Sequence, residues 1–183
     1  MAWSGIISTG RLLIEPFSEK HLSQRYVNWL NDPDVVRFSE QRFKSHTLDS
    51  CREYMHSFEG TPNFFWACVS LDPNIGHIGN INAFIDINNM SADVGILIGE
   101  SKQWGKGYGF EAFTAVVNFL FREEKIRKVT VGTLVVNKGM MKIISRLGMI
   151  DDGRRLRHVL LNGEEVDVVH GALFRSEWLN QGR

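Results

Sequence analysis

Cysteine is scarce in this chain, which has only Cys51 and Cys68 among its 183 residues. Both lie in apolar surroundings without the spacing of metal ligands, which argues against a disulfide framework or a metal site and for two buried thiols in a reducing compartment. An excess of either charge is also missing, because Lys plus Arg and Asp plus Glu both number 21. The protein therefore has no global field that would draw it to nucleic acid or to an anionic membrane.

Long hydrophobic runs are absent as well. No apolar stretch reaches the length of a membrane span, and the first residues show no basic segment leading into a hydrophobic one. We therefore expect no contact with a membrane, and the cytoplasm is the default location. The length, together with 43% hydrophobic residues, is sufficient for one compact domain.

The most informative stretch is the glycine-spaced turn Trp104-Gly105-Lys106-Gly107-Tyr108-Gly109. An apolar, β-branched strand precedes it, and an amphipathic helix follows it. Alternate glycines leave no Cβ between the backbone and a ligand, so successive N–H groups can point at one anion in front of the positive end of the helix dipole. The pattern predicts a diphosphate site, and a tight turn that merely admits the helix is the alternative. The predicted buried face of the helix consists of Ala112, Phe113, Val116, Val117 and Leu120.

Two familiar phosphate motifs fit this turn less well. The Walker pattern requires Ser or Thr after Gly-Lys, and here Gly105-Lys106 is followed by Gly107, which argues against a nucleotide triphosphatase. The dinucleotide pattern matches residues 107–112, but the next expected strand ends at residues 135–138 without the acidic residue that a ribose hydroxyl requires. An NAD-dependent enzyme is therefore kept only as an alternative.

The turn resembles motif A of the GNAT acetyltransferase superfamily, Arg/Gln-x-x-Gly-x-Gly/Ala, with Trp104 in place of the usual Arg or Gln. A tryptophan at this position makes the turn resemble that of the ribosomal-protein alanine acetyltransferases, the RimJ/RimL-like branch of the superfamily. A second signature follows at the expected distance, with Asn137, a short helix and then Leu147-Gly148-Met149. The resemblance covers nearly the whole chain.

The resemblance implies a single α/β (α+β) domain over residues 1–183, with its core at about residues 10–178. A mixed, mostly antiparallel sheet of about seven strands is flanked by helices, and its fourth and fifth strands splay apart. Turn residues separate the apolar stretches, and Asn162-Gly163 is the strongest hairpin signal. The strands are expected at residues 12–14, 64–70, 75–87, 92–98, 129–135, 154–161 and 166–174, and the helices after Ser18, Asp32, Thr47, Gly109 and Asn137.

The resemblance also implies how acetyl-coenzyme A binds. The pantetheine arm enters the gap between the splayed strands and hydrogen-bonds the fourth strand near its end. The implied cofactor-binding residues are Leu97, Ile98, Gly99, Trp104, Gly105, Lys106, Gly107, Tyr108, Gly109, Phe110, Asn137 and Lys142. From the residues alone, Asn137 serves equally well as a helix N-cap, and Lys142 as a solvated lysine. No metal is predicted.

Acetyl transfer to a primary amine requires loss of a proton, because an alkyl amine with a pKa of about 10 is almost wholly ammonium at neutral pH. The candidate catalytic residues are Asp93, acting through water, and Glu100, just past the strand. A purely structural partner is the alternative for Asp93. A backbone N–H around Ile98 would hold the oxyanion. Many GNAT enzymes carry a tyrosine near the departing thiolate, and Ile144 stands at that position here. The thiolate would therefore take its proton from Ser145 or a water, or would leave without a general acid.

The predicted activity is direct attack of an amine on acetyl-coenzyme A within a ternary complex. Residues 25–33 resemble the start of the nucleotide-sugar acetyltransferases, so an amino group of a nucleotide-linked aminodeoxysugar ranks first as acceptor. A protein N-terminal α-amine, a polyamine or drug, and an inactive coenzyme A-binding module stay as alternatives, because fold does not settle substrate. The expected partners are acetyl-coenzyme A and a small-molecule or peptide amine, without nucleic acid or membrane. A homodimer is left open.

Overall fold

The computed structural model describes residues 5–180. Eight strands form a sheet in the order β1-β2-β3-β4-β5-β6-β8-β7, in which β5 pairs in parallel with β6 and the other recorded pairs are antiparallel. This confirms the mixed, mostly antiparallel sheet, with one strand more than expected. The additional strand, β1 (Ile7–Ser8), pairs with β2 (Leu12–Pro16) and is too short to produce a recognisable pattern.

The chain forms two compact units. The first comprises the described residues up to Ala83 together with Ile96–Val116, and the second comprises Phe84–Gly95 and the described residues from Val117 onward. Three elements contribute residues to both units. These are β4 (His77–Asp86), β5 (Ser91–Ile98) and α4 (Tyr108–Arg122). A single domain over the whole chain stays a prediction.

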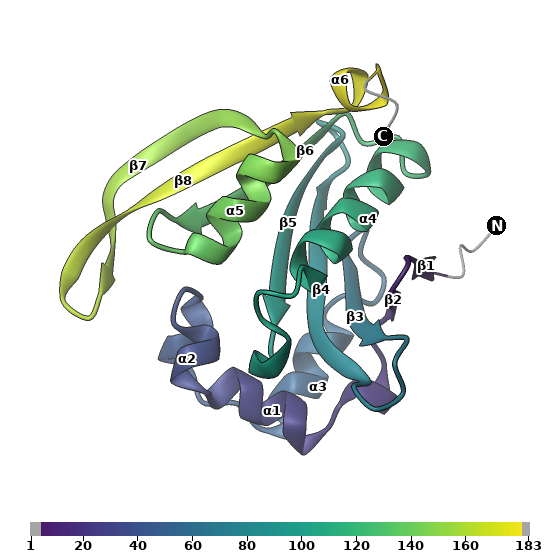
Figure 1. The fold of residues 1–183 in the computed structure, drawn as a ribbon, viewed down its shortest axis with the longest axis vertical. Coiled ribbons are helices and arrows are strands. Elements are labelled where there is room, and N and C mark those ends of the chain that lie inside the picture. Colours follow the sequence, from purple (N-terminus) through teal and green to yellow (C-terminus); the bar gives the residue numbers. More distant parts are fainter. Residues whose placement is uncertain (1–4, 181–183) are drawn as a thin grey trace. The chain divides into compact units, whose positions relative to one another are not determined.

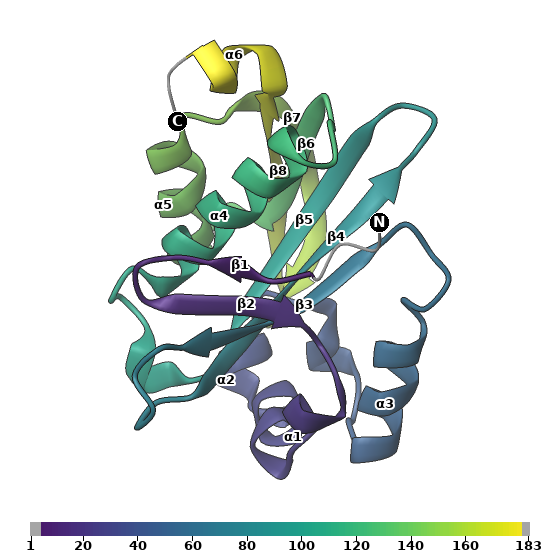
Figure 2. The same cartoon turned by 90° about the vertical axis from the view of Figure 1, so that its right-hand side faces the viewer.

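In the first unit, β2 and β3 (Phe64–Ser70) lie side by side, and β3 pairs with β4 across a register shift at Cys68/Val69 (Figure 2). Helical segments cover one face of β3 with a buried apolar cluster. Its buried members are Phe17, Tyr26, Val27, Trp29, Leu30, Cys51, Met55, Phe65 and Ala67. The helical segments of this unit, besides the start of α4, are η1 (Glu19–His21), α1 (Gln24–Asn31), α2 (Pro33–Val36), η2 (Glu40–Phe43), α3 (Leu48–His56) and η3 (Ser101–Gln103).

The helix expected after Ser18 is divided in the structure. A short 3-10 turn, η1, follows Ser18, and α1 begins only after Ser23, whose side chain accepts a hydrogen bond from the Tyr26 amide. Two cap-forming serines close together explain why the sequence pattern did not separate the elements. Asp32 and Thr47 cap α2 and α3 as expected.

In the second unit, β8 (Glu164–Phe174) pairs with β6 (Lys128–Leu134) on one side and with β7 (Ile150–Leu161) on the other. Figure 1 shows α5 (Lys138–Leu147) alongside the β7–β8 hairpin. The hairpin turns at Asn162 and Gly163, whose φ angles of 53° and 86° are those that the predicted Asn-Gly turn requires. The last helix is α6 (Arg175–Asn180).

The edge strand β7 is irregular. Its pairing with β8 shifts register between Arg155 and Val159, and Arg157 adopts a φ of 50°. The amide of Arg157 donates to Asp167 Oδ1 over 2.6 Å, and Arg154 Nε donates to Asp167 Oδ2 over 2.6 Å. Asp167 on β8 therefore holds the bulge in place.

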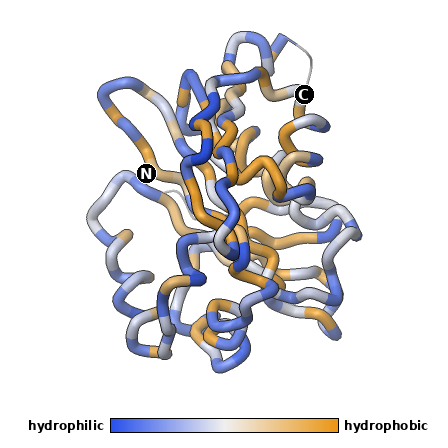
Figure 3. Tube along the Cα trace, turned by 90° about the vertical axis from the view of Figure 1, so that its left-hand side faces the viewer, coloured by the Kyte–Doolittle hydropathy of each residue, from blue (hydrophilic) through white to orange (hydrophobic). Residues whose placement is uncertain are grey.

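The predicted buried face of α4 is confirmed, because all five of its members are fully buried. These are Ala112, Phe113, Val116, Val117 and Leu120. Hydrophobic and hydrophilic residues alternate along the helical segments (Figure 3), as expected for helices that pack one face against the rest of the protein and expose the other to solvent. Among residues 5–180, no helix has the length and apolar character needed to cross a membrane.

Candidate active site

The glycine turn leads into α4 with several unpaired amides. Gly105 and Gly107 have φ angles of 74° and 86°, which side-chain-bearing residues rarely adopt. Within the described chain, the amides of Gly105, Gly107, Tyr108 and Gly109 donate to no protein acceptor. Four N–H donors therefore gather at a helix N-terminus, and this is an arrangement that fits the negative oxygens of a diphosphate.

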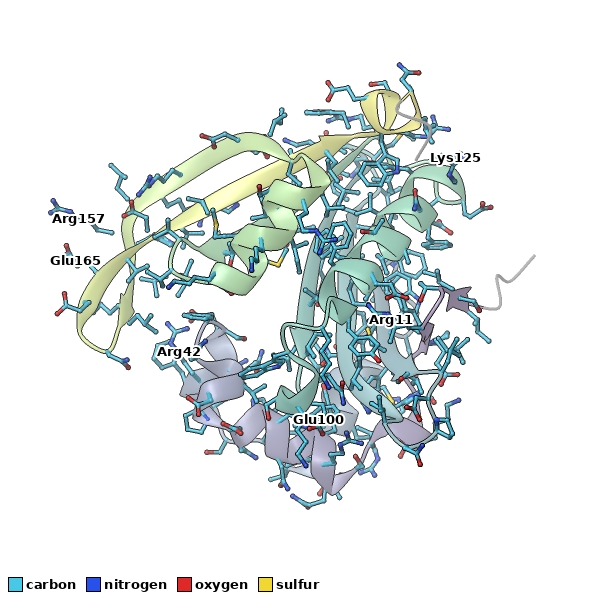
Figure 4. The ribbon with its side chains drawn as sticks, viewed as in Figure 1. Arg11, Arg42, Glu100, Lys125, Arg157 and Glu165 are labelled. Atoms are coloured by element: carbon cyan, nitrogen blue, oxygen red, sulfur yellow. The ribbon has the colours of Figure 1, made fainter. Side chains whose placement is uncertain are left out.

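Arg11, the residue immediately before β2, holds this turn by three contacts, and Figure 4 shows its place beside α4. Its guanidinium pairs with Glu111 on α4, with 2.6 Å between Arg11 Nη2 and Glu111 Oε2. Its Nη1 donates to the carbonyl of Lys106 over 3.0 Å, and its Cζ lies 4.4 Å from the centroid of the Tyr108 ring. One side chain thus connects β2, the turn and the first residues of α4.

The contact with Lys106 fixes the direction of a neighbouring amide. In a planar trans peptide, the carbonyl of one residue and the N–H of the next point in opposite directions, and the described chain contains no cis peptide bond. Because Arg11 holds the Lys106 carbonyl, the Gly107 N–H points away from Arg11. The guanidinium therefore orients one of the four free donors.

Glu111 completes this arrangement as an ionised acceptor. The Thr9 hydroxyl and the Arg11 amide both donate to its Oε1, over 2.6 and 2.9 Å. Burial alone would raise the pKa of Glu111, but the hydrogen bonds from Thr9 and Arg11 outweigh it and hold the pKa below its ordinary value. The carboxylate therefore remains charged and bound at neutral pH.

Trp104, the replacement in motif A, contacts the end of β5. Its indole Nε1 donates to the carbonyl of Ile98 over 2.6 Å, while the side chain remains 40% exposed. The amides of Gly99 and Glu100 both donate to Ile78 on β4, over 2.9 and 3.1 Å. The Gly99 amide points to β4, so the Ile98 carbonyl in the same trans peptide points away from β4 and toward Trp104. Ile98 is the last residue of β5, and the N–H and C=O of one strand residue point to the same side, so the Ile98 N–H also points away from β4.

Helix α1 packs directly on this strand end. A Cβ on Gly99 would lie 2.2 Å from Trp29 Cδ2, so the indole of Trp29 rests against the glycine backbone. Arg25 Nη2 lies 2.6 Å from Glu100 Oε2, and Arg25 Nη1 donates to the carbonyl of Ile75 over 3.2 Å. Glu100, a candidate base, is therefore an ion-pair partner of Arg25.

Asp93 lies in the second unit, at the last recorded pair between β5 and β6. Pairing links Ser91–Asp93 with Lys128–Thr130 only, although both strands continue for several residues. The Thr130 hydroxyl donates to Asp93 Oδ2 over 2.8 Å, and the aspartate is exposed. Asp93 therefore has a structural partner and also a side chain that solvent can reach.

The other predicted residues of the second unit lie on or beside α5. Asn137 caps the helix, with Oδ1 accepting from the Met140 amide over 3.2 Å and Nδ2 donating to Thr133 Oγ1 over 3.1 Å. Lys142 is exposed. Ile144 Cγ2 lies 3.3 Å from where a Cβ on Gly171 would be, so this side chain packs on β8. Contact of Asn137 and Lys142 with coenzyme A stays a prediction.

Neither cysteine is suited to nucleophilic chemistry. Both are buried free thiols, and burial raises the pKa of Cys51 and raises that of Cys68 to about 12. A thiol needs its thiolate form to attack a thioester. The described residues therefore favour direct transfer over an acyl-cysteine intermediate.

A family model described as "Acetyltransferase (GNAT) domain" matches residues 11–150. The chain belongs to this family of acetyltransferase domains. Its curated relatives include the [ribosomal protein uS5]-alanine N-acetyltransferase of Escherichia coli (strain K12), with 32% identity over 85 residues, which are 46% of this chain and 43% of the relative. The chain thus spans less than half of the length of that curated relative.

Solved structures share the fold. The chain is similar to spermidine N-acetyltransferase from Vibrio cholerae in complex with CoA and spermine, with a TM-score of 0.82, 17% identity and coverage of 94% of this chain and 100% of the other. A GNAT-family acetyltransferase from Bacillus anthracis gives a TM-score of 0.79 and 21% identity, with coverage of 93% and 99%. At these identities the likeness concerns the fold.

Sequence reasoning did not find the contacts that hold the site together. Arg11 lies in no motif of the sequence analysis, and its partner Glu111 lies 100 positions later. Arg25 and Glu100 are 75 positions apart. The only local signals were that Glu111 follows the glycine turn and that Glu100 follows the end of a strand.

Proposed function

We propose that this protein is an acetyl-coenzyme A-dependent N-acetyltransferase. The four unpaired amides at the start of α4 carry the proposal, because they suit the diphosphate of coenzyme A in number and position. The orientation of the Gly107 N–H by Arg11 adds to this. Membership in the GNAT family supplies the reaction class.

Acetyl-coenzyme A, when bound, would supply the acetyl thioester. The Ile98 N–H, which points away from β4, is suited to stabilise the oxyanion that forms when an amine attacks the thioester carbonyl. Asp93 is suited to take the ammonium proton through water, since it is exposed and its Oδ1 has no recorded partner in residues 5–180. The departing thiolate leaves without a general acid or takes a proton from water or Ser145, because Ile144, at the position of the usual tyrosine, has no proton to donate.

The proposed acceptor is an amino group of a nucleotide-linked aminodeoxysugar. Such a molecule presents phosphates and an aromatic base, and the segment after α1 carries two arginines stacked on aromatic rings. Arg37 lies 4.5 Å from the centroid of Phe38, and Arg42 lies 4.1 Å from that of Phe43, which is 69% exposed. Guanidinium groups and exposed rings favour an anionic, aromatic acceptor over a polycation.

A protein N-terminal α-amine is the second candidate. The relative from Escherichia coli is named as a ribosomal-protein alanine N-acetyltransferase, and this name is the observation that favours it. A peptide with alanine at its N-terminus would use the same thioester and the same base. The two candidates differ in charge, because the nucleotide-linked sugar brings phosphates.

Two measurements test the proposal. Calorimetric titration with acetyl-coenzyme A and with NADH should show stoichiometric binding of acetyl-coenzyme A only. Thioester consumption is then followed with a UDP-linked aminodeoxysugar, with a peptide that has alanine at its N-terminus and with spermidine. Consumption should depend on the added amine. Binding of NADH alone, or thioester loss independent of amine, would refute an N-acetyltransferase.

A further inference from the structure

One buried polar atom lies at an unexpected place in the first unit. In the described part of the chain, three buried side-chain atoms have no hydrogen-bond partner, and they are His46 Nε2, Asn80 Oδ1 and His170 Nε2. Two belong to imidazole rings, whereas Asn80 presents an amide oxygen with two lone pairs. A buried acceptor without a donor destabilises a fold. The oxygen of Asn80 is therefore free to accept a hydrogen bond from a donor outside the protein.

Asn80 lies at the centre of β4, on the face that carries the apolar cluster. It pairs directly with Ala67 on β3, and its neighbour on the same face, Asn82, pairs with Phe65. Residues directly opposite on paired strands project to the same face, and both Ala67 and Phe65 belong to the buried cluster. The amide oxygen thus adjoins the side chains that α1 and α3 pack onto the sheet.

The same residue adjoins the strand end that carries the reaction in the proposed function. A Cβ on Gly79 would lie 2.1 Å from the carbonyl oxygen of Leu97 and 2.9 Å from the Cα of Ile98, so the two backbones are in close contact here. Leu97 also packs against the apolar cluster. Asn80 is therefore one residue away from the contact between β4 and the amide suited to hold the oxyanion.

We propose that Asn80 Oδ1 binds the acceptor by accepting a hydrogen bond from its amino group. This inference rests on the proposed function. An amide oxygen takes no proton at neutral pH, so Asn80 does not act as a base, and its role is to hold one N–H of the amine. With that N–H held, the lone pair of the neutral nitrogen is free to face the thioester carbonyl. The acceptor site accordingly includes the face of β4 at Asn80, with Ala67 on the neighbouring strand β3 and Leu97 on β5.

The test compares two substitutions on one strand. Asn80→Leu replaces the amide by an apolar group of similar size, and Asn82→Leu does the same two residues away, where no orphaned oxygen is present. Acetyl transfer is measured with whichever amine the parent consumes fastest among a UDP-linked aminodeoxysugar, an alanine-terminated peptide and spermidine. We expect Asn80→Leu to lower kcat/KM for the amine by about tenfold or more, with acetyl-coenzyme A affinity and melting temperature retained. Asn82→Leu should lower it far less.

A purely structural role predicts a different result. Removing an unpaired buried oxygen without other loss would leave kcat/KM intact, and that result would overturn the inference while leaving the enzyme assignment in place. If Asn80→Leu fails to fold, the side-chain amide resonances of the parent with bound coenzyme A decide. Adding the amine should shift the Asn80 resonance and leave that of Asn82 in place, and no shift at Asn80 would overturn the inference. A parent that consumes no thioester with any of the three amines refutes the proposed function, and this inference with it.

Discussion

Replacing Arg11 by Met tests whether one side chain orients the diphosphate turn. The substitution keeps much of the aliphatic stem and removes the bonds to Glu111 and to the Lys106 carbonyl. The ion pair itself contributes little to stability, about 0–1 kcal/mol, because the Arg11 side chain is 47% exposed. The larger effect concerns the Gly107 N–H. Once its peptide can rotate, a hydrogen bond to a charged phosphate worth about 1.5–3 kcal/mol is lost, which corresponds to roughly 10–150-fold weaker binding.

Calorimetric titration with coenzyme A measures this effect directly. The matched control is Arg52→Met, since Arg52 is 40% exposed and pairs with Glu19 and Asp49 away from the turn. Both variants should unfold at nearly the same temperature as the parent, and only Arg11→Met should bind coenzyme A more weakly. Equal affinity of Arg11→Met and the parent would refute the argument that the guanidinium orients the amide.

Three other predictions concern packing, pH and catalysis. Gly99→Ala places a Cβ 2.2 Å from Trp29 and should lower the free energy of unfolding by about 1–3 kcal/mol, whereas Gly10→Ala, with open space around it, should have no such effect in thermal melts. Burial lowers the pKa of His77 from its ordinary value of 6.5 to about 4, so between these values the unfolded chain binds a proton that the folded chain does not, and stability falls as pH decreases, by up to ~3 kcal/mol. Urea unfolding of His77→Gln should show a smaller loss over this range, and an unchanged loss would contradict the argument. Asp93→Asn should lower kcat by about 100-fold or more, and a kcat like that of the parent would rule out Asp93 as the base.

Local patterns in the sequence predicted much of the fold. The apolar face of α4 follows from a 3.6-residue period, and the hairpin at Asn162-Gly163 follows from two residues that tolerate positive φ. The parallel pairing of β5 and β6 follows from the helical crossover that connects them. Each of these features depends on residues that are close together in the chain or on a known arrangement of strands.

The contacts that shape the site could not be predicted in this way. Arg11 and Glu111 meet only after β2 and α4 have been brought together, and nothing in either local sequence specifies the partner. Within residues 5–180, the Asn80 side-chain oxygen has no partner because none of its neighbours in the fold places a hydrogen-bond donor within reach. A local sequence pattern cannot predict which donors the fold brings close. The sequence also could not show that the helix expected after Ser18 is divided, because Ser18 and Ser23 are both suitable N-caps.

The bulge in β7 has a consequence for the solution behaviour of the protein. An exposed edge strand of twelve residues is a template for pairing with other chains. Here the Arg157 amide is turned inward to Asp167, and the strand around it carries several arginines, with Arg157 and Glu165 near the bend of the hairpin (Figure 4). A kinked and charged edge cannot align with a copy of itself over its full length. We therefore expect this strand to resist fibril formation at concentrations where a straight, neutral edge would aggregate.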